Sequence, residues 1–257
     1  MLGAIAGDII GSIYEAAPIK TKDFPLFGPA ATFTDDTVCT VAIADALLSG
    51  GDFARYLRAW VRRHPGRGYG GLLLRWANTP GLPAYGSWGN GAAMRVSAIA
   101  WLAADEADAL ATAARSAAVS HDHPDAIAGA QATVLAAWLA RHGAAPATIR
   151  REIARRFGHD LGQSVGQIRT WYAFDISCRG TVPPAIVCAL EAHDFEDAIR
   201  NAVSLGGDSD TLACITGGIA EARHGVPTPI AEEVRRRLDR DLLEVVDRFY
   251  RTLDGRA

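Results

Sequence analysis

Apolar side chains recur at steps of three and four residues along almost the whole sequence, and strand-like alternation is scarce. This spacing puts them on one face of an α-helix, since a helix turns once in about 3.6 residues. The pattern therefore predicts an all-α fold. It is clearest in three stretches: Val38, Val41, Ala42 and Leu48; Leu102, Ala103, Leu110 and Ala113; and Val134, Leu135, Trp138 and Leu139.

Glycine- and proline-rich segments fall between the periodic stretches and predict about ten helices joined by loops. No polar linker divides the sequence, and no segment repeats with a fixed period. We therefore expect a single compact, orthogonally packed multi-helix domain over residues 1–257. The predicted loops lie at residues 25–29, 64–71, 79–91, 142–146, 179–184 and 224–229.

The composition excludes a disordered chain, because 49% of the 257 residues are hydrophobic and only 21% are charged. A formal net charge of −3 argues against a nucleic-acid partner bound over the whole surface. The arginine-rich stretch at residues 235–240 is expected on the solvated face of the last long helix, with Leu238, Leu242 and Val245 facing inward. We expect a monomer.

Four scattered cysteines, Cys39, Cys178, Cys188 and Cys214, signal neither a disulfide framework nor a zinc knuckle and fit reduced thiols. The N-terminal stretch has no basic region and carries Asp8 among its apolar residues. Nothing approaches the roughly 18 uninterrupted apolar residues of a membrane span. These features predict a cytoplasmic protein without a membrane partner.

An acidic cluster, Thr34-Asp35-Asp36-Thr37, stands immediately before a helical stretch. Helix capping explains it in part, because Thr34 or Asp35 can accept backbone N–H groups at the positive end of the helix. The same oxygen atoms could instead bind a cation. Taken alone, this cluster leaves both readings open.

A second cluster, Gly206-Gly207-Asp208-Ser209-Asp210-Thr211, opens another apolar helix. Capping explains one aspartate but not two carboxylates beside a threonine hydroxyl. Mg²⁺ takes about six oxygen ligands, and the two clusters together could supply them if the helix starts converge. Repulsion among four close carboxylates favours a binuclear metal centre over an acidic pit without cations. Asp8 either anchors the N-terminal helix or supports the metal ligands.

With two further segments, these clusters resemble the ADP-ribosylglycohydrolases, which include dinitrogenase-reductase-activating glycohydrolase and the ADP-ribosylarginine and ADP-ribosylserine hydrolases. The resemblance covers almost the whole chain and is carried by residues 7–15, 34–37, 87–95 and 206–220. It implies an all-α fold with two Mg²⁺ or Mn²⁺ ions in a cleft. It also implies cleavage of the bond between C1″ of ADP-ribose and an acceptor atom.

By position, the resemblance implies a set of site residues in this chain. Glu15 and Asp35 would serve catalysis, and residues 174–182 would form a pocket wall. The implied metal ligands are Thr34, Asp35, Asp36, Asp208, Asp210 and Thr211. The implied substrate-binding residues are Gly86, Ser87, Trp88, Gly89, Asn90, Gly91, Met94 and His121.

Simpler structural roles stay open for several of these residues. Glu15 could be a surface carboxylate, and Trp88 could pack like any aromatic residue. The segment 89–91 could form a turn, because glycine and asparagine tolerate positive φ. His121 or His123 could cap the helix that is expected to begin at Pro124.

The expected activity is metal-dependent hydrolysis of an N- or O-glycosidic bond to ADP-ribose, which releases ADP-ribose from a modified protein side chain, arginine first, or from a small molecule. The metals would orient the distal ribose and stabilise charge, while Glu15 or Asp35 would move protons. One alternative is a catalytically silent ADP-ribose-binding or crystallin-like structural member. Another is a metal-dependent phosphohydrolase, which would leave residues 87–95 unexplained.

Overall fold

The computed structural model describes residues 1–255, and within them the chain is helical without a β-strand, as the periodicity predicts. A lone antiparallel bridge pairs Gly89 with Ser177. Among these residues, no helix has both the length and the apolar character needed to cross a lipid bilayer. In chain order the elements are α1 (Leu2–Glu15), α2 (Asp35–Leu48), α3 (Phe53–Arg63), α4 (Gly71–Asn78), the 3₁₀ helices η1 (Asn90–Ala92) and η2 (Met94–Val96), α5 (Ile99–Leu102), α6 (Glu106–Ala118), α7 (Pro124–Arg141), α8 (Pro146–Phe157), α9 (Val165–Trp171), α10 (Cys178–Glu191), α11 (Phe195–Val203), α12 (Ser209–His224), α13 (Thr228–Arg237) and α14 (Arg240–Asp254).

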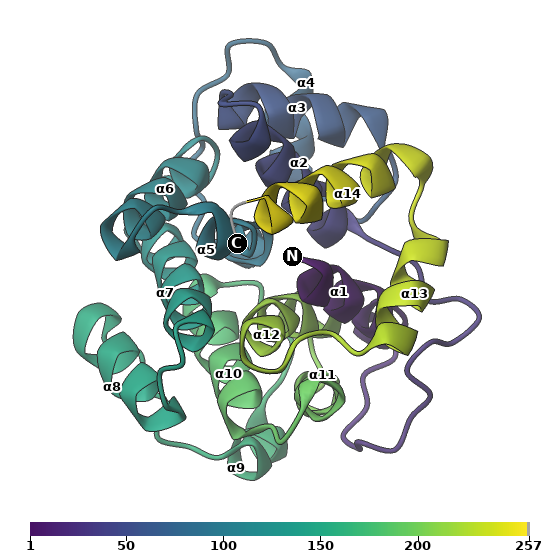
Figure 1. Ribbon diagram of the computed structural model, residues 1–257, viewed down its shortest axis with the longest axis vertical. Coiled ribbons are helices and arrows are strands. Elements are labelled where there is room, and N and C mark those ends of the chain that lie inside the picture. Colours follow the sequence, from purple (N-terminus) through teal and green to yellow (C-terminus); the bar gives the residue numbers. More distant parts are fainter. Residues whose placement is uncertain (256–257) are drawn as a thin grey trace.

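The centre of the fold is an antiparallel pair formed by α1 and α12, with the other helices around it (Figure 1). The two backbones touch. A Cβ added at Gly7 would lie 1.9 Å from the carbonyl oxygen of Ala213, and one at Gly3 would lie 2.4 Å from that of Gly217. A Cβ at Gly11 would lie 2.5 Å from the carbonyl oxygen of Ser209, directly before Asp210. Glycine at every fourth position of α1 therefore brings the start of α12 beside the end of α1.

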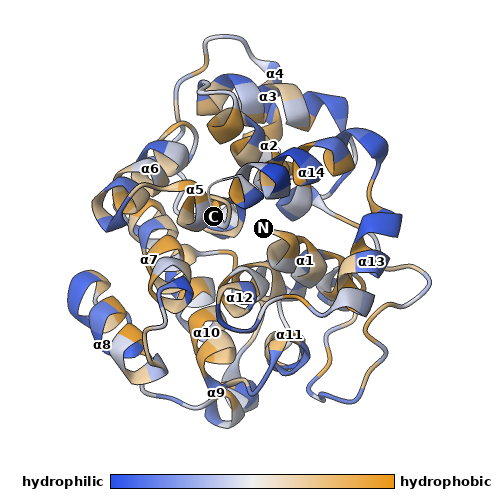
Figure 2. Cartoon of the chain, viewed as in Figure 1, coloured by the Kyte–Doolittle hydropathy of each residue, from blue (hydrophilic) through white to orange (hydrophobic). Residues whose placement is uncertain are grey.

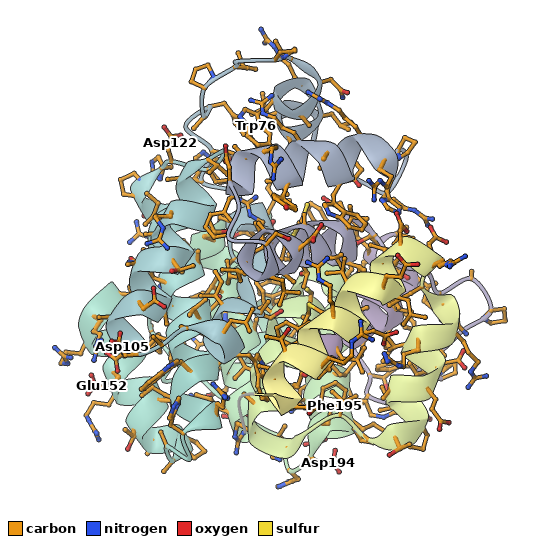
Figure 3. All side chains as sticks on the ribbon, turned by 45° about the horizontal axis from the view of Figure 1, so that its top comes forward. Trp76, Asp105, Asp122, Glu152, Asp194 and Phe195 are labelled. Atoms are coloured by element: carbon orange, nitrogen blue, oxygen red, sulfur yellow. The ribbon has the colours of Figure 1, made fainter. Side chains whose placement is uncertain are left out.

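The buried apolar side chains form one contiguous core. Figure 2 shows the hydrophobic residues gathered along α1, α10 and α12, while α8 and α13 carry polar faces. Trp76 and Phe195 are among the largest fully buried side chains, whereas Asp105, Glu152 and Asp194 lie at the periphery (Figure 3). Asp105 and Asp194 cap α6 and α11 by accepting a backbone N–H three residues further on.

Several predicted boundaries are wrong. The described residues contain fourteen α-helices rather than about ten. The predicted loop at residues 179–184 is the first part of α10, which contains Pro183 and Pro184. The arginine-rich stretch at residues 235–240 does not lie on one helix, because the chain breaks at Leu238 between α13 and α14. Leu238, Leu242 and Val245 are nevertheless buried, as predicted.

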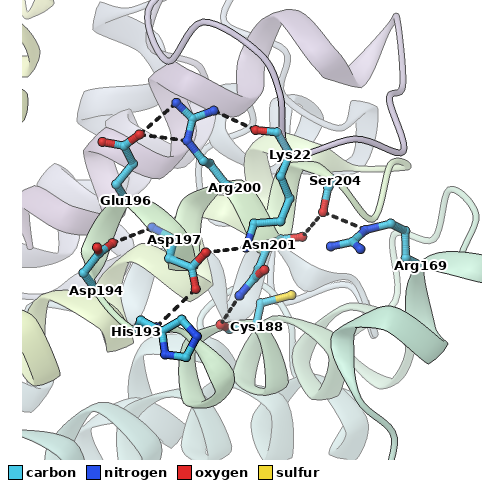
Figure 4. A network of polar contacts seen from close by, with 10 residues as sticks. All are labelled: Lys22, Arg169, Cys188, His193, Asp194, Glu196, Asp197, Arg200, Asn201 and Ser204. Atoms are coloured by element: carbon cyan, nitrogen blue, oxygen red, sulfur yellow. Dashed lines mark hydrogen bonds and ion pairs between the residues drawn. The ribbon is translucent and has the colours of Figure 1, made fainter.

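A long connection between α1 and α2, residues 16–34, is fastened to α11 (Figure 4). The Arg200 guanidinium donates to the carbonyl oxygens of Lys22 and Phe24, at 2.8 and 2.7 Å. The Lys22 ammonium in turn pairs with Asp197. This network holds the segment that joins Glu15, at the end of α1, to Thr34, at the start of α2.

Candidate metal centre and cleft

The two acidic helix starts meet, as expected from their sequences. The Thr211 hydroxyl donates to Asp36 Oδ2 at 3.2 Å, although 175 positions separate the two residues. Two trios of carboxylates have ligand atoms within 4.8 Å of one another: Asp8, Asp36 and Asp210, and Glu15, Asp208 and Asp210. Asp210 belongs to both trios and therefore lies at the middle of the acidic cluster.

Asp8 anchors the start of α2. Its carboxylate accepts the backbone N–H groups of Thr34 and Thr37, at 2.9 and 3.0 Å, and the hydroxyls of both threonines. The Thr34 hydroxyl also accepts the N–H of Asp36, which makes Thr34 the helix cap. Because four donors already occupy Asp8, its main part is to fix α2 against α1.

Polar neighbours aim the other carboxylates. Asn90 Nδ2 donates to Asp208 Oδ2 at 2.6 Å and to the Thr181 hydroxyl at 3.1 Å. Although Asp208 precedes α12, its side chain caps no backbone N–H there. Asp36 Oδ1 is buried without a hydrogen-bond partner in the described residues. In the described residues, these oxygens of Asp208 and Asp36 therefore accept no backbone N–H group of the helices and stay directed toward the acidic cluster.

Asp35 lies apart from both carboxylate trios. It lines the same cleft, with Oδ1 3.3 Å from where a Cβ on Gly68 would stand. Gly68 has φ +95°, a backbone conformation that favours glycine, so this position leaves room for the carboxylate. The backbone N–H of Asp35 donates to the Arg67 carbonyl at 2.7 Å, which fixes α2 to the segment before α4.

Burial and mutual repulsion raise the pKa values of four carboxyl groups in the cleft, those of Asp36, Asp210, Asp35 and Glu15. The pKa of Asp36 rises well above its ordinary value through burial and the charges of Asp8 and Asp35. That of Asp210 rises for the same reasons, with Asp36 and Asp208 as the neighbours. Burial, then Asp8, raises the pKa of Asp35 to about 8. Burial, then Asp208, also raises the pKa of Glu15.

The donor set fits hard divalent cations. All donors are carboxylate or hydroxyl oxygens, which Mg²⁺ and Mn²⁺ prefer. The buried Asp36 Oδ1 lacks a partner in the described residues, and the repulsion seen in the pKa values disappears when a cation neutralises it. The two trios share Asp210, so their carboxylates form one continuous group of possible cation ligands.

This electrostatic arrangement predicts a reversed pH dependence of stability without metal. Folding raises these aspartate pKa values, so the folded state binds more protons than the unfolded state between pH 3.8 and about 8. In EDTA, we expect the contribution of the cluster to the free energy of unfolding to fall as pH rises through that window. Mn²⁺ should raise the melting temperature more at pH 8 than at pH 6, because protons compete with the metal.

Differential scanning calorimetry at several pH values, with and without Mn²⁺, measures both effects. An Asp36→Asn variant is the internal comparison. In this variant, Mn²⁺ should raise the melting temperature much less, and the free energy of unfolding in EDTA should fall less as pH rises. Equal Mn²⁺ shifts at pH 6 and pH 8 in the native protein would contradict a site made of these raised carboxylates.

Beside the cluster lies an open cleft of about 340 Å³. Of the predicted substrate-binding residues, six line it and two, Gly86 and Trp88, do not. Trp88 is 47% exposed, and Gly86 donates its N–H to Asp122 Oδ1 at 2.6 Å. The six that line the cleft are Ser87, Gly89, Asn90, Gly91, Met94 and His121, together with the predicted Glu15, Thr34, Asp35, Asp36, Asp208, Asp210 and Thr211.

A chain of hydrogen bonds links the buried Arg95 to His121 through Ser120. Arg95, fully buried and a donor only, donates to Ser120 Oγ at 3.0 Å. Ser120 Oγ lies 2.8 Å from His121 Nδ1, and a Ser120 O–H that donates to Nδ1 leaves the imidazole proton on Nε2. Burial and the charge of Arg95 lower the pKa of His121 well below its ordinary value. His121 is therefore neutral, and its Nε2 lies 3.2 Å from where a Cβ on Gly91 would stand.

The sequence does not predict one part of the cleft lining, at and before the start of α4. The start of α4 contributes Leu72 and Leu73 to its lining, as does the preceding glycine-rich segment. The glycines of that segment, Gly68-Tyr69-Gly70-Gly71, are a signal of close backbone approach, whereas the breaker pattern predicts only a loop there. Phe174 and Ile176 lie in the predicted pocket wall and also line the cleft. His123, by contrast, is the cap of α7 and accepts the Asp125 N–H at 3.1 Å.

The sequence and the fold of this chain are similar to those of known proteins. The sequence matches ADP-ribosylglycohydrolase over residues 1–257. ADP-ribosylhydrolase ARH3 of Danio rerio is 26% identical, over 91% of this chain and 84% of its own length. ADP-ribosylarginine hydrolase Tri1 of Pseudomonas putida is 28% identical, over 88% and 70%. A solved ADP-ribosylglycohydrolase-related protein complex superposes with a TM-score of 0.72 at 26% identity, over 97% and 96% of the two chains. The chain therefore belongs to the ADP-ribosylglycohydrolase family and is an enzyme that hydrolyses ADP-ribose linkages.

Proposed function

We propose that the enzyme uses divalent cations to hydrolyse the bond between C1″ of ADP-ribose and an acceptor, with an arginine side chain as the preferred acceptor. The observation that carries this proposal is the meeting of two distant acidic helix starts beside a cleft of about 340 Å³. That volume lies in the usual range for small-molecule sites, roughly 300–1,000 Å³. The arginine preference rests on the likeness to a protein named ADP-ribosylarginine hydrolase.

Asp36, Asp208 and Asp210 would hold the ions, with Thr34, Asp35 and Thr211 completing the set predicted from the sequence. Bound there, Mg²⁺ or Mn²⁺ would orient the ribose hydroxyls and stabilise charge at the reacting bond. Asp8, which four donors already occupy, would keep the start of α2 in place.

Glu15 is the carboxylate we propose for proton transfer. It lies at the end of α1, lines the cleft, and belongs to the trio with Asp208 and Asp210. Burial and Asp208 raise its pKa, which moves it toward the range where a carboxyl group both accepts and releases protons near neutral pH. Asp35, whose pKa is raised to about 8, is the second candidate for this role.

The remaining cleft residues would bind the ADP-ribose itself. Backbone N–H groups in the 89–91 segment suit a pyrophosphate, because its glycines let an anion approach the main chain. His121 would add a neutral Nε2–H donor. The exposed Trp88 ring, outside the cleft lining, would contact the ligand only from the rim.

The His121 arrangement leads to a test with a matched control. We propose that the Ser120 O–H keeps the His121 proton on Nε2, so replacing Ser120 with alanine should lower ADP-ribose affinity roughly three- to tenfold. Ser116 is equally buried, but its hydroxyl has no partner in the described residues, so Ser116→Ala should leave the affinity unchanged. Calorimetric titration with ADP-ribose compares the two variants. Equal losses in both would remove the Ser120 hydroxyl from this role.

The proposed reaction itself is tested by its products. The protein is incubated with Mg²⁺ or Mn²⁺ and with arginine-, serine- and ester-linked ADP-ribose conjugates, and the products are separated by chromatography. We expect free ADP-ribose, no release in EDTA, and the highest rate with the arginine conjugate. Release of AMP or phosphate would support a phosphohydrolase instead. Binding without turnover would support a catalytically silent member, which the Glu15 carboxylate and both acidic clusters disfavour.

The wider setting belongs to the same proposal. We propose that the chain works as one domain and as a monomer on ADP-ribosylated proteins or small molecules, without a nucleic-acid partner. A cytoplasmic location agrees with its four cysteines, which are free and buried.

A further inference from the structure

The Lys20 ammonium joins two segments that border the cleft. It donates at 2.6 Å to the carbonyl of Tyr172, in the wall segment (residues 172–176), and also to the carbonyl of Leu205, in the α12 loop (residues 205–208). Building on the proposed binding of ADP-ribose in the cleft, we propose that Lys20 is a positioning residue for the hydrolysis. Its ammonium holds both segments against the α1–α2 connection and thereby fixes the side chains that they present to the substrate.

All three segments carry side chains of the cleft. The wall segment, which follows α9, contributes Phe174 and Ile176, and the α12 loop, which leads into α12, contributes Asp208. The α1–α2 connection begins directly after Glu15, which also lines the cleft. The contacts of the Lys20 ammonium therefore join segments that place proposed ligand, catalytic and substrate-binding groups.

Two glycines let these segments pack closely. Gly206, with φ +70°, lies against the α1–α2 connection, where a Cβ would stand 3.4 Å from the Ile19 carbonyl oxygen and from Lys20 Cε. Gly207, with φ +81°, lies against the wall segment, where a Cβ would stand 3.0 Å from the Ala173 carbonyl oxygen. The α12 loop is therefore packed between the connection and the wall segment, and the Lys20 ammonium bridges the same three pieces.

The chain has only two lysines, and they fasten the same connection at two places. The Lys20 ammonium binds backbone carbonyls and has no ion pair within residues 1–255. The Lys22 ammonium pairs instead with Asp197 on α11 (Figure 4), and no residue of α11 is among those that line the cleft. Because a charged donor makes stronger hydrogen bonds than a neutral one, each contact restrains the connection. Only the contacts of Lys20 lie beside the cleft.

The two lysines provide a variant and its matched control, Lys20→Met and Lys22→Met. Methionine removes the charge and the donors and keeps an unbranched side chain. Lys20 is exposed, so its replacement leaves no cavity in the core. In Lys22→Met, the backbone carbonyl of Lys22 still accepts from Arg200 at 2.8 Å, so the connection stays attached to α11. The substrate is the conjugate that the product assay finds to be cleaved, and rates are measured where thermal unfolding shows every variant to be folded.

We expect Lys20→Met to lower kcat/KM about 30-fold, with a fall in kcat and a rise in KM, because a shift of about 1 Å in a reactive geometry costs up to about 10²-fold. Lys22→Met should stay within about twofold of the native enzyme. Lys20→Arg should stay within about fivefold, because a guanidinium also binds two carbonyls, as Arg200 does with those of Lys22 and Phe24. Equal kcat/KM values for Lys20→Met and Lys22→Met, or a Lys20→Arg enzyme as slow as Lys20→Met, would overturn the positioning role.

A second measurement uses the native protein and does not depend on turnover. Two lysines give two side-chain ammonium resonances in ¹⁵N-labelled protein, and the Lys22→Met variant assigns them. At an ADP-ribose concentration that saturates a calorimetric titration, we expect the Lys20 resonance to shift and the Lys22 resonance to stay in place. An unshifted Lys20 resonance would overturn the positioning role. Failure to hydrolyse any conjugate would contradict the proposed reaction instead, and the ammonium resonances would still decide the role of Lys20.

Discussion

Replacing Asp210 with asparagine should abolish hydrolysis, lowering kcat by roughly 10³-fold or more. Asp210 is the carboxylate common to both trios, so the change removes a ligand charge from each half of the proposed metal centre. The same change should stabilise the metal-free protein, because it removes one of the buried charges that repel each other near Asp36. Activity and stability therefore move in opposite directions.

These opposite responses separate a metal ligand from a structural residue. The measurements are ADP-ribose release with Mn²⁺ and thermal unfolding in EDTA and in Mn²⁺. Asp23→Asn is the matched control, since Asp23 is an exposed carboxylate on the α1–α2 connection with no side-chain hydrogen bond in residues 1–255. It should leave all three readings unchanged. An Asp210→Asn enzyme within tenfold of the native rate would contradict the ligand assignment.

Much of the fold can be predicted from the local sequence pattern, and the prediction fails where tertiary packing overrides that pattern. The apolar period predicts α2 and α7, and Pro124 marks the start of α7 correctly. The sequence predicts a loop from Arg179 to Pro184 because proline breaks helices. In α10 both prolines stand inside the helix, and both are buried. Tertiary packing of this kind is invisible to a local pattern.

The part of the site that could be predicted from the sequence is the part where the same residue types occur twice. Two Asp/Asp/Thr groups at helix starts predicted a shared centre, and the Thr211–Asp36 hydrogen bond brings them together. The sequence could not decide the part played by Asp8, because its four donors come from the start of α2, across the α1–α2 connection. The position of Trp88 between Ser87 and Gly89 predicts that it binds substrate. The backbone there turns Ser87 and Gly89 to the cleft and leaves Trp88 outside its lining.

The close contact between α1 and α12 is the structural feature on which the acidic cluster depends, and Gly7 tests it. A methyl group at Gly7 would stand 1.9 Å from the Ala213 carbonyl oxygen, which is backbone and has no rotamer by which to move away. Gly7→Ala must therefore push the helices apart, at a cost of about 3 kcal/mol or more in the free energy of unfolding. That corresponds to a drop in melting temperature of roughly 6–12 °C for a domain of this size.

The same separation should reach the metal centre, because Asp8 and Glu15 lie on α1 while Asp210 lies on α12. We therefore expect Gly7→Ala to weaken Mn²⁺ binding even at temperatures where the variant is folded. Gly166→Ala is the control, since a Cβ there would meet only Ser164 Oγ, at 3.8 Å, within helix α9. Alanine at that helical position should be neutral or stabilise the protein by up to about 1 kcal/mol. Thermal unfolding and Mn²⁺ titration of both variants give the comparison. If Gly7→Ala melted like the native protein and bound Mn²⁺ as tightly, backbone contact between these helices would not be what brings the carboxylates together.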